Sequence, residues 1–361
     1  MNDFIVVGGG IAGISAAARL SHLGRVTVLE AEAGLGYHAS GRSAAMFEQT
    51  YGQPSTIALN RASKDYHMTA NGGVLSPRGL MLLGSTHDSE AFDGDLKSME
   101  MHEISVADAR AMVPILRPDV VKRVAYHAEA WDIDTDRLIQ NFAREVRGNG
   151  GLIELNARVD GIERHGRRWQ VRAGDRDWQG AMLVNAAGAW VDQVAAMADV
   201  EPLGFRPYRR SMARIPAPGG HDIGAWPMLF GPGEAWYAKP DAGKLLVSPA
   251  DEDPAEPHDA WPEDMVLAEG LARYEAMVTE PVTRLEHSWA GLRTFAKDRS
   301  LVIGFDPADR SFFWVAGQGG YGFQTSPAAS QLAADLVAGC RPTLDKDVVA
   351  ALDPARFART G

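Results

Sequence analysis

The chain has 361 residues, 45% of them hydrophobic and 23% charged, so it is typical of a globular protein too long for one core, and we expect two domains. Its formal net charge of -11 argues against nucleic acid or an anionic membrane as a partner, because both would repel it. A single cysteine, Cys340, excludes an internal disulfide framework, and the sequence shows neither a secretory signal nor a run of roughly 18 apolar residues. We therefore expect a cytoplasmic protein with no integral membrane segment.

The N-terminal residues predict a strand, a turn and a helix. Residues 4–7 (Phe-Ile-Val-Val) form the continuous apolar run that is typical of a buried parallel strand. Glycines follow at 8–10, and residues 11–23 form an alanine-rich segment that predicts a helix stopped by Gly24. Residues 26–29 are a second apolar run, so this part of the chain predicts the start of a βαβ unit.

Three glycines in this turn, Gly8, Gly10 and Gly13, have the spacing of the dinucleotide-binding fingerprint. The spacing alone is weakly specific, but its position between a strand and a helix is informative, because the helix N-terminus can bind phosphate. Glu30, about 20 residues further on, ends the next strand and is placed to accept a hydrogen bond from ribose hydroxyls. The alternative is a glycine turn beside a surface glutamate.

The remaining chain changes between α/β and antiparallel patterns. A helix is predicted over 138–146, with Asp134 and Thr135 at its start, and the turn residues 240–243 separate two apolar runs as in a β-hairpin. The acidic, proline-rich stretch 251–258 is predicted to be a solvated loop. This alternation indicates domains that are discontinuous in sequence. The other predicted elements are strands at 169–172, 182–185 and 312–315, further strands between 209 and 248, and a helix from about 328 to 337.

Two segments rich in small residues could contact a flat cofactor. The segment 184–190 (Val-Asn-Ala-Ala-Gly-Ala-Trp) predicts a strand entering a small-residue turn, which would equally suit a packed crossover. In 317–327 (Gly-Gln-Gly-Gly-Tyr-Gly-Phe-Gln-Thr-Ser-Pro), four glycines precede a helix start, which points free N–H groups at an anion. A reduced flavin carries negative charge near N1 and the C2 carbonyl, so this helix start would stabilise it. A glycine-rich surface turn is the alternative.

Two arginines in strand-like segments, Arg210 and Arg293, are candidate carboxylate ligands. A guanidinium stays charged and offers a planar fork of donors, so an arginine among apolar residues invites a carboxylate. Pairing with an internal aspartate or glutamate is the more common explanation and stays open. The sequence contains no zinc-like Cys/His spacing, nucleophile elbow or P-loop, so it predicts no metal site. His221, His258 and His287 are expected to be structural or surface residues.

Together these segments resemble the D-amino-acid oxidase and glycine oxidase family of flavoproteins, and within it the branch of bacterial D-arginine dehydrogenases. The likeness covers essentially the whole chain, and the combination of motifs is highly specific although no single motif is. The motifs that carry it are 8–13, 39–45 (Ala-Ser-Gly-Arg-Ser-Ala-Ala), 75–78 (Leu-Ser-Pro-Arg), 184–190, 226–228 (Trp-Pro-Met), 237–243 (Tyr-Ala-Lys-Pro-Asp-Ala-Gly), 289–295 (Trp-Ala-Gly-Leu-Arg-Thr-Phe) and 317–326.

The resemblance implies an α/β fold in which an FAD-binding, Rossmann-like domain of the glutathione-reductase type adjoins a second, mainly antiparallel β substrate domain. It implies an FAD-binding domain at 1–70, 134–205 and 298–361, and a substrate domain at 71–133 and 206–297. The residues that it implies as FAD contacts are Gly8, Gly10, Ile11, Ala12, Gly13, Glu30, Ala31, Ala39, Ser40, Gly41, Arg42, Ser43, Ala44, Ala45, Met46, Val159, Ala187, Gly188, Trp190, Gly291, Gly319, Gly320, Tyr321, Gly322, Phe323 and Gln324.

For the substrate, the resemblance implies a D-amino acid whose carboxylate is held by Arg210 and Arg293. Tyr51 matches a lid tyrosine, and Tyr237 and the Gly320 carbonyl match groups near the amine. The predicted catalytic residues are the two arginines and the two tyrosines, Arg210, Arg293, Tyr51 and Tyr237. The implied reaction is hydride transfer from Cα to flavin N5, after which the imino acid hydrolyses to a 2-oxo acid and ammonia. No side chain is assigned as the base. The electron acceptor is a quinone or O2, and FAD is expected to bind non-covalently because no cysteine stands where some relatives tether it.

Two departures from the D-arginine dehydrogenase pattern predict a different substrate side chain. Leu80 stands where those enzymes have an acidic residue for the substrate guanidinium, and Met46 stands where they have a histidine. With Met228 and Phe230 the pocket becomes apolar, and burying a guanidinium there without a counter-charge would cost several kcal/mol. Apolar D-amino acids are therefore the predicted substrates, with Glu48, close to the lid, as the one residue that could partly compensate for a cationic side chain.

Other functions stay open at this point. Oxidation of a secondary amine, a glycine-type substrate or a 2-hydroxy acid would suit the same carboxylate clamp. An NAD-linked dehydrogenase shares the N-terminal fingerprint but leaves the segment 317–327 unexplained. A flavoprotein acting on modified tRNA is disfavoured by the acidic charge, and a non-catalytic FAD-binding protein would show no flavin bleaching with any amine or hydroxy acid.

Overall fold

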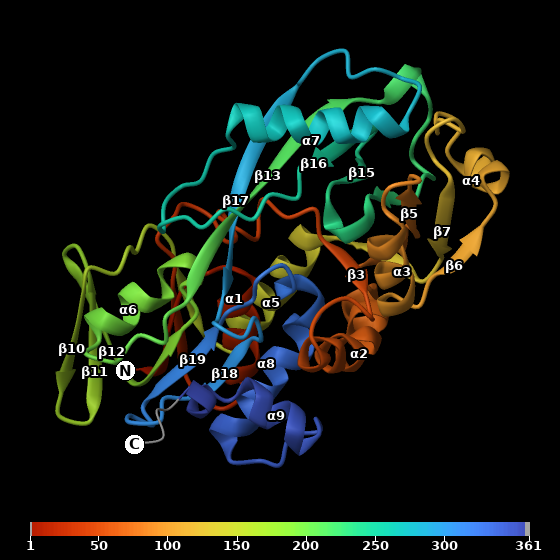
Figure 1. Ribbon diagram of the computed structural model, residues 1–361. Coiled ribbons are helices and arrows are strands. Elements are labelled where there is room, and N and C mark those ends of the chain that lie inside the picture. The colour runs from red at the N-terminus through yellow and green to blue at the C-terminus, as the bar shows by residue number, and fades with distance from the viewer. Residues whose placement is uncertain (1, 358–361) are drawn as a thin grey trace.

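The computed structural model describes residues 2–357 (Figure 1), and in this range the strands form two sheets of eight strands and one of three. The first sheet contains β1 (Asn2–Val7), β2 (Val26–Leu29), β9 (Leu152–Glu154), β10 (Gly161–His165), β11 (Arg168–Ala173), β12 (Arg176–Asn185), β18 (Val302–Phe305) and β19 (Phe312–Ala316). The second contains β5 (Leu80–Gly84), β6 (His102–Ile104), β7 (Arg123–His127), β13 (Arg206–Pro216), β14 (Met228–Phe230), β15 (Tyr237–Asp241), β16 (Lys244–Ser248) and β17 (His287–Phe295). The third contains β3 (Met46–Glu48), β4 (Leu75–Pro77) and β8 (Ala130–Ile133).

Helices and short 3-10 turns connect these strands. The α-helices of the described chain are α1 (Ile11–Leu20), α2 (Pro54–Thr69), α3 (Ser89–Ser98), α4 (Val106–Met112), α5 (Thr135–Gly148), α6 (Val191–Met197), α7 (Asp264–Met277), α8 (Gly322–Ala338) and α9 (Lys346–Leu352). The 3-10 turns are η1 (Ala70–Gly72), η2 (Gly188–Trp190), η3 (Pro218–Gly220), η4 (Pro232–Glu234) and η5 (Pro354–Phe357). Among residues 2–357, no helix combines the length and the apolar character that crossing a membrane requires.

The first sheet is built around parallel strands that are buried on both faces. Its order is β10-β11-β12-β1-β2-β9, with β19 also beside β12 and β18 beside β19. Along β1, Phe4 and Val6 pack into the core with α1, α5 and α8, whereas Ile5 and Val7 pack into a second core with α6. The continuous apolar run of residues 4–7 is explained by this double burial, because each face of the strand needs an apolar residue at every second position.

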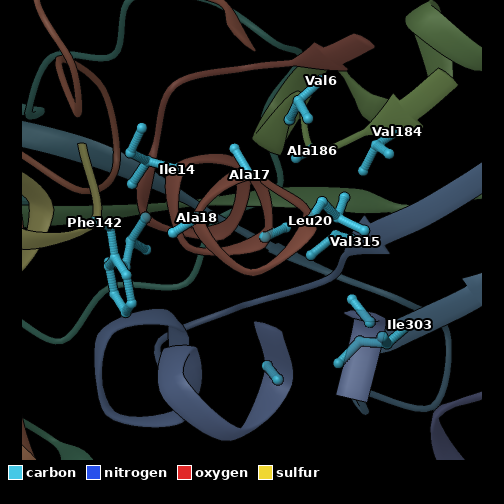
Figure 2. Close-up of a cluster of buried hydrophobic side chains, with 14 of the residues drawn as sticks. Val6, Ile14, Ala17, Ala18, Leu20, Phe142, Val184, Ala186, Ile303 and Val315 are labelled. Atoms are coloured by element: carbon cyan, nitrogen blue, oxygen red, sulfur yellow. The ribbon is translucent and has the colours of Figure 1, made fainter. Parts of the chain in front are cut away.

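Helix α1 lies at the centre of the core on one face of this sheet. Figure 2 shows α1 end-on, with Val6 and Val184 of the sheet on one side and Phe142 of α5 on another. Ala17 and Ala18 are fully buried, and these small side chains let the neighbouring elements pack closely on the helix. The packing holds the N-terminal end of α1 beside the glycine turn.

The second sheet is mainly antiparallel, in the order β17-β13-β16-β15-β14-β5-β7-β6. Only β14 and β5 pair in parallel within it. Helix α7 lies across one face (Figure 1), where Tyr274 is fully buried among residues such as Ala238, Leu245 and Val247. The opposite face is therefore free to point toward the first sheet.

The small third sheet, in the order β3-β8-β4, joins chain segments that were assigned to different domains. Strand β3 belongs to segment 1–70, and β4 and β8 belong to segment 71–133. The predicted domain boundaries stay a proposal.

The predicted fold class is confirmed: an α/β unit with a Rossmann-like start accompanies a second, mainly antiparallel sheet. The predicted helix 138–146 lies inside α5, and the Asp134 side chain accepts a hydrogen bond of 2.9 Å from Arg137 N, as an N-cap does. The predicted hairpin is formed by β15 and β16, which are joined by a turn at 242–243.

Three element predictions were wrong in part. Helix α1 ends at Leu20, and a turn follows it before Gly24. Helix α8 begins at Gly322 and not near 328, so that Pro327 lies inside it. Proline has no N–H to donate to the Phe323 carbonyl, and the Ser326 hydroxyl donates to that carbonyl instead, at 2.9 Å.

The stretch 251–258 is not uniformly solvated. Asp251 is only 9% exposed and accepts hydrogen bonds from Ser211 N at 2.6 Å and from Ser211 Oγ at 2.8 Å. It also pairs with Arg209 at 3.2 Å, so one acidic residue of this stretch is part of the packed structure. The sequence offered no signal for this, since the partners come from another strand.

His67 ties α2 to the first turn of α8 inside the core. The side chain has no solvent exposure, and Nε2 donates to the Gln324 carbonyl at 3.0 Å, which can only accept. Its ring lies 5.2 Å from the Phe47 ring, centroid to centroid. Burial lowers the pKa of His67 to about 4.

We predict that His67 makes the folded state less stable in mild acid. The unfolded chain binds this proton near pH 6.5 and the folded chain only near pH 4, so stability is lost as the pH falls between these values, by about 3 kcal/mol. His67→Gln keeps an N–H donor but does not titrate, so the difference in unfolding free energy between the two proteins should change over this window. Urea unfolding followed by circular dichroism at a series of pH values measures it. A pH-independent difference would contradict the prediction.

Candidate active site

A cavity of about 440 Å³ is lined by residues of both large sheets. Val7 and Leu29 line it from the ends of β1 and β2, while Arg210, Tyr237 and Arg293 line it from β13, β15 and β17. Carboxyl ends of parallel strands are where open α/β sheets bind ligands. One continuous space thus connects the glycine turn with the two candidate arginines.

The glycine turn has no room for side chains at two positions. A Cβ on Gly8, whose φ is 105°, would lie 2.4 Å from the Ala186 carbonyl oxygen, and a Cβ on Gly13 would lie 1.9 Å from the Gly8 carbonyl oxygen. These contacts press α1 against the strand and leave the turn open toward the cavity. At Ile11, the backbone N–H donates to Ser40 Oγ at 3.0 Å, which fixes the loop 39–46 next to this turn.

Glu30 lines the cavity and also holds the turn in place. Its carboxylate accepts hydrogen bonds from Gly9 N at 2.7 Å and from Glu32 N at 2.9 Å. Burial raises the pKa of Glu30 more than these two backbone hydrogen bonds lower it. A carboxylate has about four acceptor positions, so Glu30 retains capacity for a hydroxyl donor.

Most of the residues predicted to contact FAD line the cavity. They are Gly8, Gly10, Ile11, Ala12, Glu30, Ala31, Ala39, Ser40, Arg42, Ser43, Ala44, Val159, Ala187, Gly188, Trp190, Gly291, Gly319, Gly320, Gly322 and Phe323. The predicted residues that do not line it are Gly13, Gly41, Ala45, Met46, Tyr321 and Gln324. For Gln324 the reason is visible, because its side-chain oxygen accepts a hydrogen bond of 3.1 Å from Glu48 N.

Several cavity residues were missed by the sequence analysis, and they gather beside the end of β2. His38 Nε2 lies 3.1 Å from Glu32 Oε1, which also pairs with Arg158 at 2.8 Å. The His38 ring is 4.7 Å from the Trp190 ring. Of these residues, only Tyr37 and His38 could have been found from the sequence, because they directly precede the predicted FAD-contacting loop 39–46.

The loop 258–260 also reaches the cavity, which corrects the expectation that His258 is only structural or superficial. Arg42 holds this loop, because it donates to the Ala260 carbonyl at 3.0 Å and pairs with Asp259. It also donates to the Ala290 carbonyl at 2.8 Å. The predicted solvated loop is thus part of the cavity wall.

The N-terminal end of α8 faces the cavity, as the glycine-rich segment predicted. Gly322 and Phe323 line it, and the first turn of the helix contains no acidic residue. A Cβ on Gly319 would lie 2.2 Å from the Phe295 ring, and one on Gly320 would lie 2.9 Å from Arg293 Cζ. The glycines are therefore required by the packing, and the helix end suits an electron-rich group.

Six of the ten predicted substrate residues lie on one face of the second sheet, namely Leu80, Arg210, Met228, Phe230, Tyr237 and Arg293. Paired residues of neighbouring strands share a face. Arg293 pairs with Tyr208, and Arg210 lies two residues further along the same strand. Tyr237 pairs with Phe230. Met228, two residues before Phe230 on β14, pairs with Leu80. Strand β16 lies between β13 and β15, and its register with both places these four residues on the face of Arg210 and Arg293. This face is the one opposite to α7.

Arg210 is buried and lacks close partners. Its Nε and one terminal nitrogen have no hydrogen-bond partner, although its side chain is only 9% exposed. The carboxylates nearest to its terminal nitrogens are those of Glu234 at 3.9 Å and Glu252 at 4.0 Å. The alternative of a tight internal ion pair is therefore not realised in the described chain.

Arg293 has no ion pair or side-chain hydrogen bond within residues 2–357. Burial lowers its pKa, but Tyr51, Tyr237 and Glu234 together raise that pKa above its ordinary value. An arginine in such surroundings stays charged. The two guanidinium groups thus give the cavity a positive wall.

Tyr51 and Glu234 lie over this wall. Burial raises the pKa of Tyr51, and the carboxylate of Glu234 raises it further while Arg293 lowers it. The Tyr51 ring is 5.2 Å from the Tyr321 ring. Tyr51 does not itself line the cavity. Glu234, on η4, was missed because nothing in its sequence surroundings indicates a position near the arginines.

The four apolar residues predicted for the substrate side chain are brought together. Leu80 and Phe230 are buried in one cluster with Tyr237, and Met46 and Met228 pack against it. None of the four lines the cavity, which adjoins the cluster at Tyr237 and Ala44. The carboxylate of Glu48 accepts hydrogen bonds from Thr50 and lies 3.2 Å from His127.

The comparisons with known proteins agree with this architecture. The model of the family described as FAD dependent oxidoreductase (DAO) matches residues 3–336. Among curated relatives, the glycine oxidase of Pseudomonas putida is 24% identical, covering 94% of this chain and 96% of that protein. Among solved structures, L-proline dehydrogenase from P. horikoshii has a TM-score of 0.83 at 20% identity (99% and 98% coverage). L-alpha-glycerophosphate oxidase from Mycoplasma pneumoniae, solved with FAD bound, has a TM-score of 0.83 at 18% identity (96% and 96%). With the family model matching most of its length, this chain belongs to the FAD dependent oxidoreductase (DAO) family.

Proposed function

We propose that this protein oxidises a small D-amino acid to its imino acid, which water then hydrolyses to a 2-oxo acid and ammonia. The observation that carries the proposal is the Arg210 side chain, two of whose buried nitrogens have no hydrogen-bond partner, in a cavity shared with Arg293. Buried guanidinium donors without a hydrogen-bond acceptor are costly, so they are best explained by an anion that binds there. The carboxylate of an amino acid satisfies both arginines.

FAD, when bound, accepts the hydride that leaves the substrate Cα. The residues that would hold it are those of the glycine turn, Glu30, the loop 39–46 and the first turn of α8. Gly8 and Gly319 have no room for a side chain, so the backbone itself borders the cavity at these two positions. We propose that the flavin is held without a covalent bond, because the sequence 292–294 (Leu-Arg-Thr) contains no cysteine.

The protein's own groups orient the substrate. Arg210 and Arg293 would bind the carboxylate, and Tyr237 and the carbonyl of Gly320, two residues that also line the cavity, would face the amine. The carbonyl can accept a hydrogen bond from a neutral amine and leave its lone pair free to assist the departure of hydride. Tyr51 would cover the bound substrate. No side chain of this site is proposed as the base.

The substrate side chain would enter the cluster of Met46, Leu80, Met228 and Phe230, which favours apolar D-amino acids over D-arginine. Electrons would leave to a quinone or to O2. Relatives act on other substrates by name, among them glycine and L-proline. Oxidation of a glycine-type or secondary amine is therefore the second candidate, and the same clamp would also accept a 2-hydroxy acid.

Anaerobic bleaching of the yellow holoenzyme tests the proposal. Matched D- and L-forms of leucine, methionine, phenylalanine, proline and arginine, together with glycine and 2-hydroxy acids, are mixed with the protein, and the flavin absorbance is followed. We expect the apolar D-forms to bleach the flavin fastest. Acid precipitation afterwards should release all of the FAD. Bleaching by L-forms, by glycine or by hydroxy acids alone would contradict the proposal, and retention of flavin in the pellet would contradict non-covalent binding.

A further inference from the structure

Glu48 is a buried acid that the proposed reaction does not use. It lies on β3, where Met46 and Glu48 point to one side and Phe47 points to the other, into the core around α1. Met46 packs against the cluster of Leu80 and Phe230, so Glu48 faces the same region. The residue is only 4% exposed.

The two carboxylate oxygens of Glu48 have different surroundings. Oε1 accepts hydrogen bonds from Thr50 N at 2.9 Å and from Thr50 Oγ1 at 2.8 Å. Oε2 has no hydrogen-bond partner, and the imidazole of His127 lies beside it, with Nε2 at 3.2 Å. Burial raises the pKa of Glu48, while His127 and the Thr50 hydrogen bonds lower it. One oxygen is thus structural, and the other depends on His127.

His127 lies at the edge of the proposed side-chain pocket. It is paired with Leu80 between β5 and β7, so its side chain shares the sheet face of Leu80, Met228 and Phe230. Its side chain is 17% exposed and that of Glu48 is 6% exposed. An acid and an imidazole therefore sit together beside an otherwise apolar cluster.

We propose that His127 sets the charge selectivity of this site by pairing with Glu48, which withholds the carboxylate from cationic substrate side chains. The proposal rests on the proposed function. The Nε2 atom of His127 beside Glu48 Oε2 screens the carboxylate, so the pair offers less attraction to a guanidinium or ammonium than the carboxylate alone would. Without the imidazole, Oε2 of the buried carboxylate has no basic group beside it, and a substrate cation can supply one.

Two carboxylic acids that differ only in a terminal ammonium test this without turnover. Hexanoate and 6-aminohexanoate both suit the arginine clamp, and neither has an α-amine to oxidise. Their dissociation constants for the holoenzyme are measured by calorimetry at neutral pH, for the unmodified protein and for His127→Leu. We expect the unmodified protein to prefer hexanoate, and His127→Leu to shift the ratio of the two constants toward 6-aminohexanoate by about tenfold or more.

The double variant E48Q/H127L is the matched control, because it lacks the imidazole and also lacks the charge. It should return the ratio to that of the unmodified protein. An unchanged ratio in H127L, or the same shift in E48Q/H127L, overturns the role of His127 while leaving the clamp intact. Failure of hexanoate to bind any of the proteins overturns the proposed function and this inference with it. If H127L does not retain FAD, His127→Asn, which removes the imidazole with a smaller change in polarity, supplies the same measurement.

Discussion

Replacing Arg293 by methionine should abolish most of the activity and leave FAD bound. Arg293 lines the cavity, is not engaged by any other side chain of residues 2–357, and has the same sheet face as Arg210. Losing one partner of a desolvated charge pair costs about 2–5 kcal/mol, which corresponds to roughly 30-fold to several-thousand-fold in kcat/KM. Arg210→Met should act in the same direction with a smaller effect, because Glu234 and Glu252 already weaken the field of Arg210.

Arg214→Met is the matched control for this experiment. Arg214 belongs to the same strand as Arg210, but its side chain is 44% exposed and it does not line the cavity. Steady-state kinetics with the best D-amino acid and the flavin content of each protein are the two measurements. Normal kinetics in the Arg293 variant would mean that the carboxylate is held elsewhere. Loss of flavin would mean that Arg293 supports the cofactor site and not the substrate.

Apolar D-amino acids should exceed D-arginine in kcat/KM by about tenfold or more, and Leu80→Glu should reverse much of this preference. Burial of an isobutyl, thioether or benzyl group contributes about 1.5–3 kcal/mol, whereas a guanidinium in the same place loses its hydration without gaining a partner. Leu80 is 4% exposed and lies opposite Met228 and His127. A glutamate there would supply the missing counter-charge.

Leu80→Gln controls for size and polarity, since it introduces no charge. The ratio of kcat/KM for D-arginine to that for D-leucine is measured for the three proteins at the same pH. Only the glutamate variant should move the ratio toward D-arginine. A preference of the unmodified protein for D-arginine would refute the assignment of the apolar pocket and make Glu48 the residue to test.

The sequence was sufficient for those features whose physical cause is local. The run Phe4–Val7, the glycines that follow and the helix after them are an uninterrupted stretch of chain, and their hydrophobic pattern and backbone freedom predicted β1, the turn and α1. The same holds for the helix around Phe142 and for the glycines before α8. The resemblance of separate motifs extended this to the cavity, where most of the predicted FAD contacts lie.

The tertiary structure alone decided which distant side chains neutralise each other. No local pattern in the sequence indicates that Asp251 is buried against Ser211 and Arg209, because that contact depends on how a loop returns to β13. Glu48 was expected close to the lid, and its backbone carbonyl does accept a hydrogen bond from Tyr51 N at 3.4 Å, but its contact with His127 depends on how β3 and β7 meet. The residues around Arg210 and Arg293 indicated each arginine separately, and only the family resemblance joined them as one clamp; the register of β13 with β17 puts them on one face. Local patterns determine the elements, whereas charge pairing depends on distances of a few ångströms between residues far apart in the chain, which folding sets.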